Sequence, residues 1–337
     1  MKNEVAITGV GLISPWGERI EDIVSALNKT EKSDGDKPVV MKTIGQFDSV
    51  QKLGRKGLRQ MNRSAMFSVY AALQCLSDSN LDASLASDEL GVVLGTQFGH
   101  LDRMEQMMKV IRDEGARSLN PTDAGYGGLN VLASIIGVRT NAKAVNATIN
   151  NGCASGLDAA LYACGMITGG HAKYVLAGGV ETTSKYYLEW LRANQNDRAY
   201  EGAGFIQLEK PDTAERRGIK PYAVIRAFAS LPYVGADCVT KSMNKALMSA
   251  SISAEEIDLF IGGDKCSYKY ENSKFQPKRK IFIKDILGEG MAVSGIYQLL
   301  IALRFLKDDY RNALIHLCGQ GENSLSVILT NSAAMTR

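Results

Sequence analysis

The chain has 337 residues, of which 45% are hydrophobic and 22% are charged, and its formal net charge is +3 at pH 7. This composition is typical of a globular protein with a large core, and so small a net charge argues against a nucleic-acid-binding surface. We expect neither a transmembrane helix nor a secretory signal. The six cysteines include no CxxC pair, so we expect reduced thiols in a cytoplasmic protein, without a disulfide framework or a metal site.

The first elements follow from hydrophobic periodicity. The sequence predicts a strand at 4–10, a turn at 11–17, a helix at 20–27, a polar loop at 29–38, a helix at 58–76 and a strand at 90–94. Gly9 and Gly11 begin a pattern used in dinucleotide binding, but Ser14 stands where its third glycine belongs. We therefore expect no dinucleotide site, and nothing else in the chain calls for a cofactor.

The segment 99–114 carries an apolar stripe. Leu101, Met104, Met108 and Ile111 follow one another at spacings of three, four and three residues, which places them on one face of a helix. The ordinary interpretation is a helix that faces the core. Met and Leu are also flexible side chains that can shape the wall of a cavity.

A cysteine follows at a predicted corner between a strand and a helix. Residues 143–149 read as a buried strand, Gly152 allows a tight turn, and residues 154–166 have helical spacing. Cys153 therefore lies near a helix start, where unpaired N–H groups and the helix dipole favour a thiolate. The alternative is that Cys153 is a small buried apolar residue, as most cysteines are.

The rest of the chain repeats the alternation of strands and helices. After a strand at 174–177 and a hairpin around 202–209, the polar stretch 211–221 is the best candidate linker. The second half then offers strands at 223–228, 259–262 and 280–284, helices at 236–250 and 291–305, and a hairpin of 314–318 with 325–329. We predict a layered α/β protein made of two similar halves, residues 1–210 and 221–337.

Several of these motifs, in this order, resemble those of the β-ketoacyl synthases. The corner Cys153-Ala-Ser155-Gly156 is similar to the family's nucleophile elbow. Further similarities run along the chain, at residues 5–17, 56–82, 94–99, 176–181 (LAGGVE), 201–209 (EGAGFIQLE), 284–295 and 319–329. The resemblance implies the thiolase fold, a five-layered αβαβα sandwich, with Cys153 as the nucleophile or its remnant.

The chain departs from this family at three loops that serve condensation. By the resemblance, Gly263 and Glu289 occupy the places of the two catalytic histidines, and Gln320 replaces the phenylalanine of the gating loop. Lys284 is retained and could pair with Glu289 or Asp285. The family's histidines donate hydrogen bonds where an enolate develops, and an ionised carboxylate cannot do so. We therefore expect no condensing activity.

One functional interpretation is a non-condensing subunit similar to the chain-length factors of type II polyketide synthases. The resemblance then implies an active ketosynthase as dimer partner, an acyl carrier protein, and neither nucleic acid nor membrane as partners. It places Leu101, Met104 and Met108 at the end wall of a shared tunnel. It also assigns the dimer contact to one strand: Ala144, Val145, Asn146, Ala147 and Thr148. The basic cluster 274–280 is either a solvated loop or a surface for an acidic carrier.

Two further interpretations stay open. Typical chain-length factors have glutamine at the cysteine position, whereas this chain keeps Cys153, which could still accept an acyl group as an acyltransferase or loading enzyme. That chemistry needs an oxyanion hole, which the N–H of Cys153 and one from loop 319–321 could form, and a base, for which Glu289 and His100 are the candidates. The last interpretation is a binding scaffold without a tunnel.

Overall fold

The computed structural model describes residues 4–28, 39–121, 125–232, 237–263, 275–307, 310–318 and 323–334. The predicted loop 29–38, Gln320, Cys266 and most of the stretch between Gly263 and the basic cluster lie outside these residues. No helix in the described part of the chain is long and apolar enough to cross a bilayer.

Ten strands form one continuous mixed sheet, in the order β10-β9-β11-β12-β8-β1-β7-β5-β3-β4, and β2 pairs with β6 in a small separate sheet. In chain order the strands are β1 Val5–Ile13, β2 Val40–Lys42, β3 Leu90–Gly95, β4 Asn146–Ile149, β5 Tyr174–Glu181, β6 Arg198–Tyr200, β7 Gly202–Glu209, β8 Ala223–Pro232, β9 Leu259–Gly262, β10 Arg279–Phe282, β11 Asn312–Cys318 and β12 Asn323–Asn331.

The strand order shows the same motif twice. Read from the outer edge inward, β4-β3-β5-β7-β1 in the first half corresponds to β10-β9-β11-β12-β8 in the second. In both halves the first two pairings are parallel and the next two antiparallel. The halves join where Val5–Ile7 of β1 pairs antiparallel with Ala223–Ile225 of β8. A short helix, α9, occupies part of the predicted linker 211–221, and the division of the chain at this point stays a prediction.

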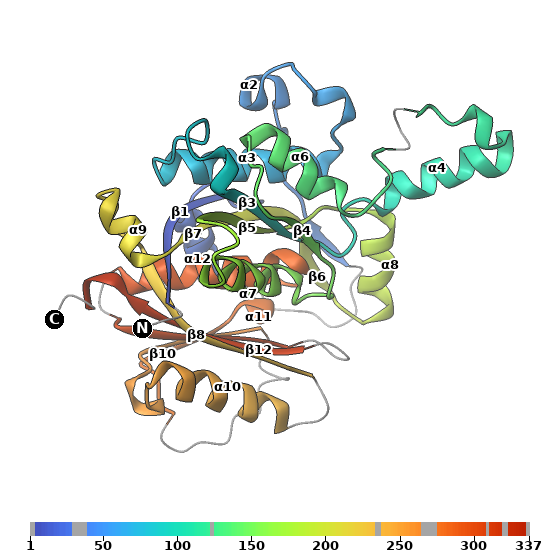
Figure 1. The fold of residues 1–337 in the computed structure, drawn as a ribbon. Helices are drawn as coiled ribbons and strands as arrows, with labels where there is room; N and C mark the ends of the chain where they lie inside the picture. Colours follow the sequence, from blue (N-terminus) through green and yellow to red (C-terminus); the bar gives the residue numbers. More distant parts are fainter. Residues whose placement is uncertain are drawn as a thin grey trace.

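Helices complete the layers on both sides of each half-sheet (Figure 1). They are α1 Ile20–Leu27, α2 Ser49–Leu53, α3 Arg63–Asp78, α4 Leu101–Glu114, α6 Val131–Thr140, α7 Ser155–Thr168, α8 Lys185–Ala193, α9 Pro211–Arg216, α10 Asp237–Ala250, α11 Ile283–Leu287 and α12 Ala292–Leu306. Helices α3 and α6 cover the outer face of the first half-sheet, α7 and α12 lie between the two half-sheets, and α10 covers the outer face of the second. The predicted five-layered αβαβα arrangement is confirmed.

The inner layer brings the starts of two helices together. Every residue of α12 except Arg304 is buried, as expected for a helix that packs on all sides. A Cβ at Gly156 of α7 would lie 2.0 Å from the carbonyl oxygen of Ala292. This close approach places the start of α7, and with it Cys153, beside the start of α12.

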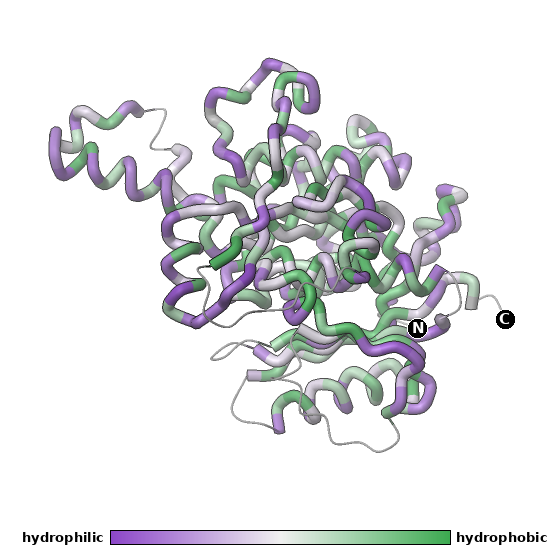
Figure 2. The backbone as a smooth tube through the Cα atoms, turned by 180° about the vertical axis from the view of Figure 1, so that it is seen from behind, coloured by the Kyte–Doolittle hydropathy of each residue, from purple (hydrophilic) through white to green (hydrophobic). Residues whose placement is uncertain are grey.

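Three predictions about single elements are wrong. Strand β7 is not part of a local hairpin but lies in the middle of the sheet, between β5 and β1. The strand before Cys153 is short and half-buried, because β4 is the edge of the sheet. Helix α4 is not a core helix, because none of its residues is buried. It projects from the body of the molecule (Figure 1), and Figure 2 shows its mixture of hydrophilic and hydrophobic positions.

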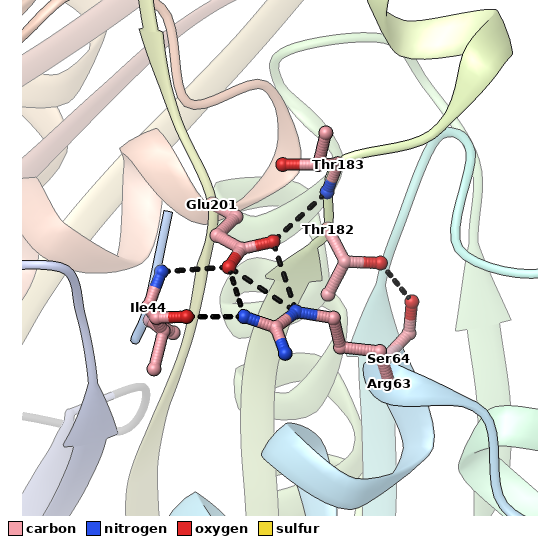
Figure 3. Close-up of polar contacts among 6 residues, drawn as sticks. All are labelled: Ile44, Arg63, Ser64, Thr182, Thr183 and Glu201. Carbon is pink, nitrogen blue, oxygen red and sulfur yellow. Dashed lines mark hydrogen bonds and ion pairs between the residues drawn. The ribbon is translucent and has the colours of Figure 1, made fainter. Parts of the chain in front are cut away.

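An ion pair between the exposed Arg63 and the buried Glu201 fixes the start of α3 (Figure 3). Glu201 is fully buried, and its carboxylate binds the Arg63 guanidinium and accepts N–H groups from Ile44 and Thr183. Removing Arg63 would leave the buried Glu201 carboxylate uncompensated. The pair holds the start of α3 to the residue between β6 and β7, and the Thr183 N–H ties the segment after β5 to the same carboxylate. Next to it, the N-cap Asn62 donates to the carbonyl oxygen of Gly99 at 2.8 Å, just before α4.

Candidate functional site

Cys153 lies at the predicted corner between β4 and α7. Gly152 has a φ of 57°, a left-handed conformation that glycine adopts without strain, and α7 begins two residues after the cysteine. The Ser155 hydroxyl accepts the N–H of Asn151 and donates to the carbonyl oxygen of Gly152, which closes the turn. The side chain of Cys153 is only 3% exposed.

An apolar cluster encloses the cysteine. The buried members around Cys153 are Phe98, Tyr187, Leu191, Ala199 and Met291. The rings of Phe98 and Tyr187 stack with centroids 5.7 Å apart. Burial, assisted by nearby Glu289, raises the pKa of Tyr187 well above its ordinary value, so its hydroxyl stays protonated. Such surroundings oppose ionisation of a thiol, whereas the adjacent helix start favours it.

A buried carboxyl group holds two walls of this cluster together. Glu181, at the end of β5, accepts the N–H groups of Gln97 and Phe98 at 2.9 Å each, and also that of Ala292 at the start of α12. Burial raises the pKa of Glu181 to about 8, although these donors act in the opposite direction. The sequence identified Glu181 only as part of a turn motif, because nothing local indicates which loops it binds.

The structure brings Gly263 close to Lys284 and Glu289, which follow it in the sequence by 21 and 26 residues. The Lys284 N–H donates to the carbonyl oxygen of Gly263 at 2.9 Å, and a Cβ at Gly263 would lie 3.7 Å from Lys284 Cε. Lys284 Nζ lies 2.8 Å from Glu289 Oε2, and the side chains of the two residues are 14% and 4% exposed. The pairing of Lys284 with Glu289, one of the two alternatives predicted, is confirmed.

Both carboxylate oxygens of Glu289 accept from groups of this chain. Oε2 binds Lys284, and Oε1 accepts the backbone N–H of Met291 at 2.7 Å. Both oxygens of the Glu289 side chain are thus occupied as acceptors, and Gly263 has no side chain. The two loops therefore place no side-chain hydrogen-bond donor at Gly263 or Glu289.

The loop around Glu289 is pressed against β6. The N–H of Glu289 donates to the carbonyl oxygen of Arg198, and the carbonyl oxygen of Glu289 accepts from the Tyr200 N–H, each at 2.9 Å. The Tyr187 hydroxyl donates to the same Glu289 oxygen at 2.7 Å. A Cβ at Gly288 would lie 2.6 Å from the Arg198 carbonyl oxygen, and a Cβ at Gly290 would lie 2.2 Å from the Tyr200 ring. Glycine on both sides of Glu289 is thus required by the close approach.

Met291 has a strained backbone. Its φ of 48° and ψ of −130° match the first central position of a type II′ turn, which normally takes glycine. Such a conformation costs about 1–3 kcal/mol for other residues and persists only where the surroundings enforce it. The Glu289 carboxylate, which binds the Met291 N–H, is one such constraint. Neither Met291 nor Phe98 was identified from the sequence, since strain and enclosure depend on tertiary structure.

The three histidines have separate environments. His100 is buried at the base of α4, with Nδ1 3.3 Å from Asn62 Nδ2, and burial lowers its pKa. His316 lies 3.0 Å from the Ser326 hydroxyl, and His171 is exposed. His100 and Glu289, the two predicted candidate bases, are thus engaged by Asn62 and Lys284, respectively.

The predicted tunnel and interface residues are exposed or partly buried. Met104 and Met108 on α4 are 37% and 63% exposed, whereas Leu101 packs against the cluster that contains Cys153. Among the strands that the structure describes, β4 pairs with β3 alone. Because the carbonyl oxygens of Val145 and Ile149 accept from β3, the N–H groups of Asn146 and Thr148 point away from it.

Residues 2–194 match the family described as "Beta-ketoacyl synthase, N-terminal domain". The chain belongs to the β-ketoacyl synthase family. It is 28% identical over 262 residues to 3-oxoacyl-[acyl-carrier-protein] synthase 2 of Synechocystis sp., a match that covers 68% of this chain and 62% of that relative. With the protein of the same name from Coxiella burnetii it is 22% identical over 369 residues, covering 94% and 89%.

The β-ketoacyl synthase fold is equally evident among solved structures. "The ishigamide ketosynthase/chain length factor" superposes with a TM-score of 0.83 at 18% identity, covering 98% of this chain and 100% of that one. A complex described as "AntDE:AntF (apo): type II PKS acyl-carrier protein in complex with its ketosynthase bound to the hexaketide" also gives 0.83, at 20% identity, with the same coverage. The predicted thiolase fold is confirmed.

Proposed function

We propose that this β-ketoacyl synthase homologue is a non-condensing subunit that shapes a shared acyl tunnel, in the manner of a chain-length factor. The observation that carries the proposal is the engagement of Glu289 by Lys284 and by the Met291 N–H. Decarboxylative condensation needs hydrogen-bond donors where the enolate charge develops. At the two positions that correspond to the family's catalytic histidines, this chain has Gly263, which has no side chain, and Glu289, whose carboxylate would repel that charge.

The proposed partners are an active ketosynthase and an acyl carrier protein. Strand β4 supports the first, because it is an uncharged sheet edge that directs the N–H groups of Asn146 and Thr148 outward. An exposed edge of this kind is a template for a second strand. The type II complex described above contains an acyl carrier protein bound to its own ketosynthase. The cytoplasm is the compartment we propose, where cysteines stay reduced.

The proposed tunnel wall is helix α4. Its inner end is anchored at Leu101, while Met104 and Met108 extend into solvent in the single chain. Exposed methionines on a projecting helix fit a surface that a partner covers, and their flexible side chains can close a cavity of variable depth. In this proposal Met108 limits the length of the chain that the partner builds.

A second candidate is an acyltransferase that uses Cys153. The position of the cysteine beside the start of α7 favours it, since a helix start is where nucleophilic cysteines commonly lie. In that case an acyl thioester forms on Cys153 before the acyl group passes to another acceptor. The candidate base Glu289 is held by Lys284, which is why we rank this function second.

Replacing Cys153 with alanine distinguishes the tunnel-subunit function from the acyltransferase function. As a tunnel subunit, the C153A chain should support product formation by its ketosynthase partner at a rate within about twofold of the wild type, because no bond to Cys153 is made. As an acyltransferase, the wild-type chain should gain an acyl mass at Cys153, and C153A should lose essentially all transfer. The test combines a product assay with mass spectrometry of the intact chain after incubation with acyl carrier protein.

A further inference from the structure

We propose that the Lys284–Glu289 ion pair is a latch that holds Met291 in place as a cover of the Cys153 thiol. The latch would keep acyl groups from the thiol and so explain how a nucleophile can remain in a non-condensing subunit. This consequence rests on the proposed function, but the geometry of the latch does not. Met291 and Glu289 act here as positioning residues.

The first step of the argument is the link from the ion pair to Met291. Glu289 Oε2 is bound to Lys284 Nζ, and Oε1 accepts the Met291 N–H two residues further on. The hydrogen bond holds the N–H of Met291. The direction of this N–H relative to the side chain depends on the φ angle, which has an unusual value of 48°. The ion pair fixes the carboxylate, and the carboxylate in turn fixes the strained residue.

The second step is the rigid attachment of the latch. Glu289 forms an isolated β-bridge with Ala199, and its carbonyl oxygen accepts from the Tyr187 hydroxyl. Ala199 and Tyr187 belong to the same buried cluster as Cys153 and Met291. The loop that carries the latch is therefore bound to the walls of the cluster that it closes.

The third step is the choice of residue. Glycine would adopt the Met291 conformation without strain, so a large side chain at this position is retained against the preference of the backbone. That side chain is 1% exposed and packs in the cluster in which Cys153 is 3% exposed. A flexible, apolar side chain of this size can close a narrow entrance to a thiol.

The experiment measures how fast iodoacetamide alkylates Cys153, by mass spectrometry of peptides from the full chain. Met291→Gly removes both the cover and the strain, and we expect alkylation about tenfold faster than in the wild type. Met291→Leu is the matched control, since it keeps an apolar side chain of similar volume, and its rate should stay within about twofold. The double variant Lys284→Met, Glu289→Gln opens the latch without leaving a lone buried charge, and we expect about a fivefold increase.

Cys164 is an internal reference, because it is buried on α7, the helix that follows Cys153, and lies outside the cluster. In every variant its alkylation should remain slow, which shows that the fold is intact. The proposal is supported if Cys153 alone becomes reactive in M291G and in the double variant. It is overturned if Cys153 reacts at the wild-type rate in both, or if wild-type Cys153 reacts as fast as in urea-unfolded chain. No partner or product enters this assay, so its failure is distinct from failure of the proposed function.

Discussion

The two halves of this chain have the same strand order but different corners before their inner helices. In the first half, β4 leads through Gly152 and Cys153 into α7, at the corner that resembles the family's nucleophile elbow. In the second half, β10 leads through the Glu289 loop and the strained Met291 into α12. Both corners meet in one buried cluster. Under the proposed function, condensing chemistry is lost in the second half, where Lys284 and Glu289 form an ion pair, while the first half keeps Cys153 at its corner.

The outer edges of the halves differ as well. Strand β4 is uncharged, whereas β10, at the equivalent place, carries Arg279 and Lys280. Charged residues on an edge strand discourage pairing with another chain. The second half also has no described helix between β9 and β10, where the first half inserts α4 and α6 between β3 and β4. Both differences favour the first half as the site of the proposed partner contact.

The largest expected effect comes from blocking the β4 edge. Thr148→Pro removes an N–H that points away from β3 and leaves the internal ladder intact. We expect association with the partner to weaken by at least about 100-fold, since strand addition depends on these groups. Sedimentation of the mixture measures the change.

Lys280→Pro is the matched control, because Lys280 occupies the outward position on β10, the opposite edge. It should leave association within about twofold of the wild type. The edge assignment is wrong if Lys280→Pro disrupts the complex and Thr148→Pro does not.

A smaller effect is expected at the projecting helix. Met108→Ala should lengthen the product of the reconstituted complex and Met108→Trp should shorten it, each by about one extension unit, because the cavity gains or loses the volume of one side chain. Chromatography with mass spectrometry of the products measures the shift. Lys109→Ala, next to Met108 on α4, is the control and should change nothing. An unchanged product profile in both Met108 variants contradicts a tunnel-wall role.

The smallest effect concerns the buried acid of the first half. Burial raises the pKa of Glu181 from 4.5 to about 8, so between these values the folded chain holds a proton that the unfolded chain has released. Its contribution to stability therefore falls as pH rises from about 4.5 to about 8 and is constant above that range. Between pH 6 and pH 8.5, we expect the Tm of the wild type to drop by about 2–4 °C more than that of Glu181→Gln, which does not titrate. Equal slopes for the two proteins would contradict the raised pKa.

Local pattern was sufficient for several elements of this fold. The predicted helix 20–27 and strand 259–262 coincide with α1 and β9, since their periodicity and flanking turns are contained in a few residues. Strand β7 was predicted as a hairpin because the sequence does not reveal that its neighbours are β1 and β5. Helix α4 shows the same limit. An apolar stripe in the sequence identifies one face of a helix, but it does not show what packs against that face.

The candidate site was predictable only in part. The cysteine corner and the pairing of Lys284 with Glu289 could be proposed from motifs and spacing. The enclosure by Phe98 and Tyr187 could not, because one residue lies in the loop after β3 and the other in α8, and they have no shared local signal. The strain at Met291 was also invisible, since no sequence rule places a methionine at positive φ.

The most direct test of the non-condensing role is purification of the tagged full-length chain from its native host, followed by native mass spectrometry. We expect an equimolar complex with a ketosynthase that carries the complete Cys-His-His set, and no acyl mass on Cys153. A homodimer of this chain with an acyl group on Cys153 would contradict that role and establish acyl transfer instead.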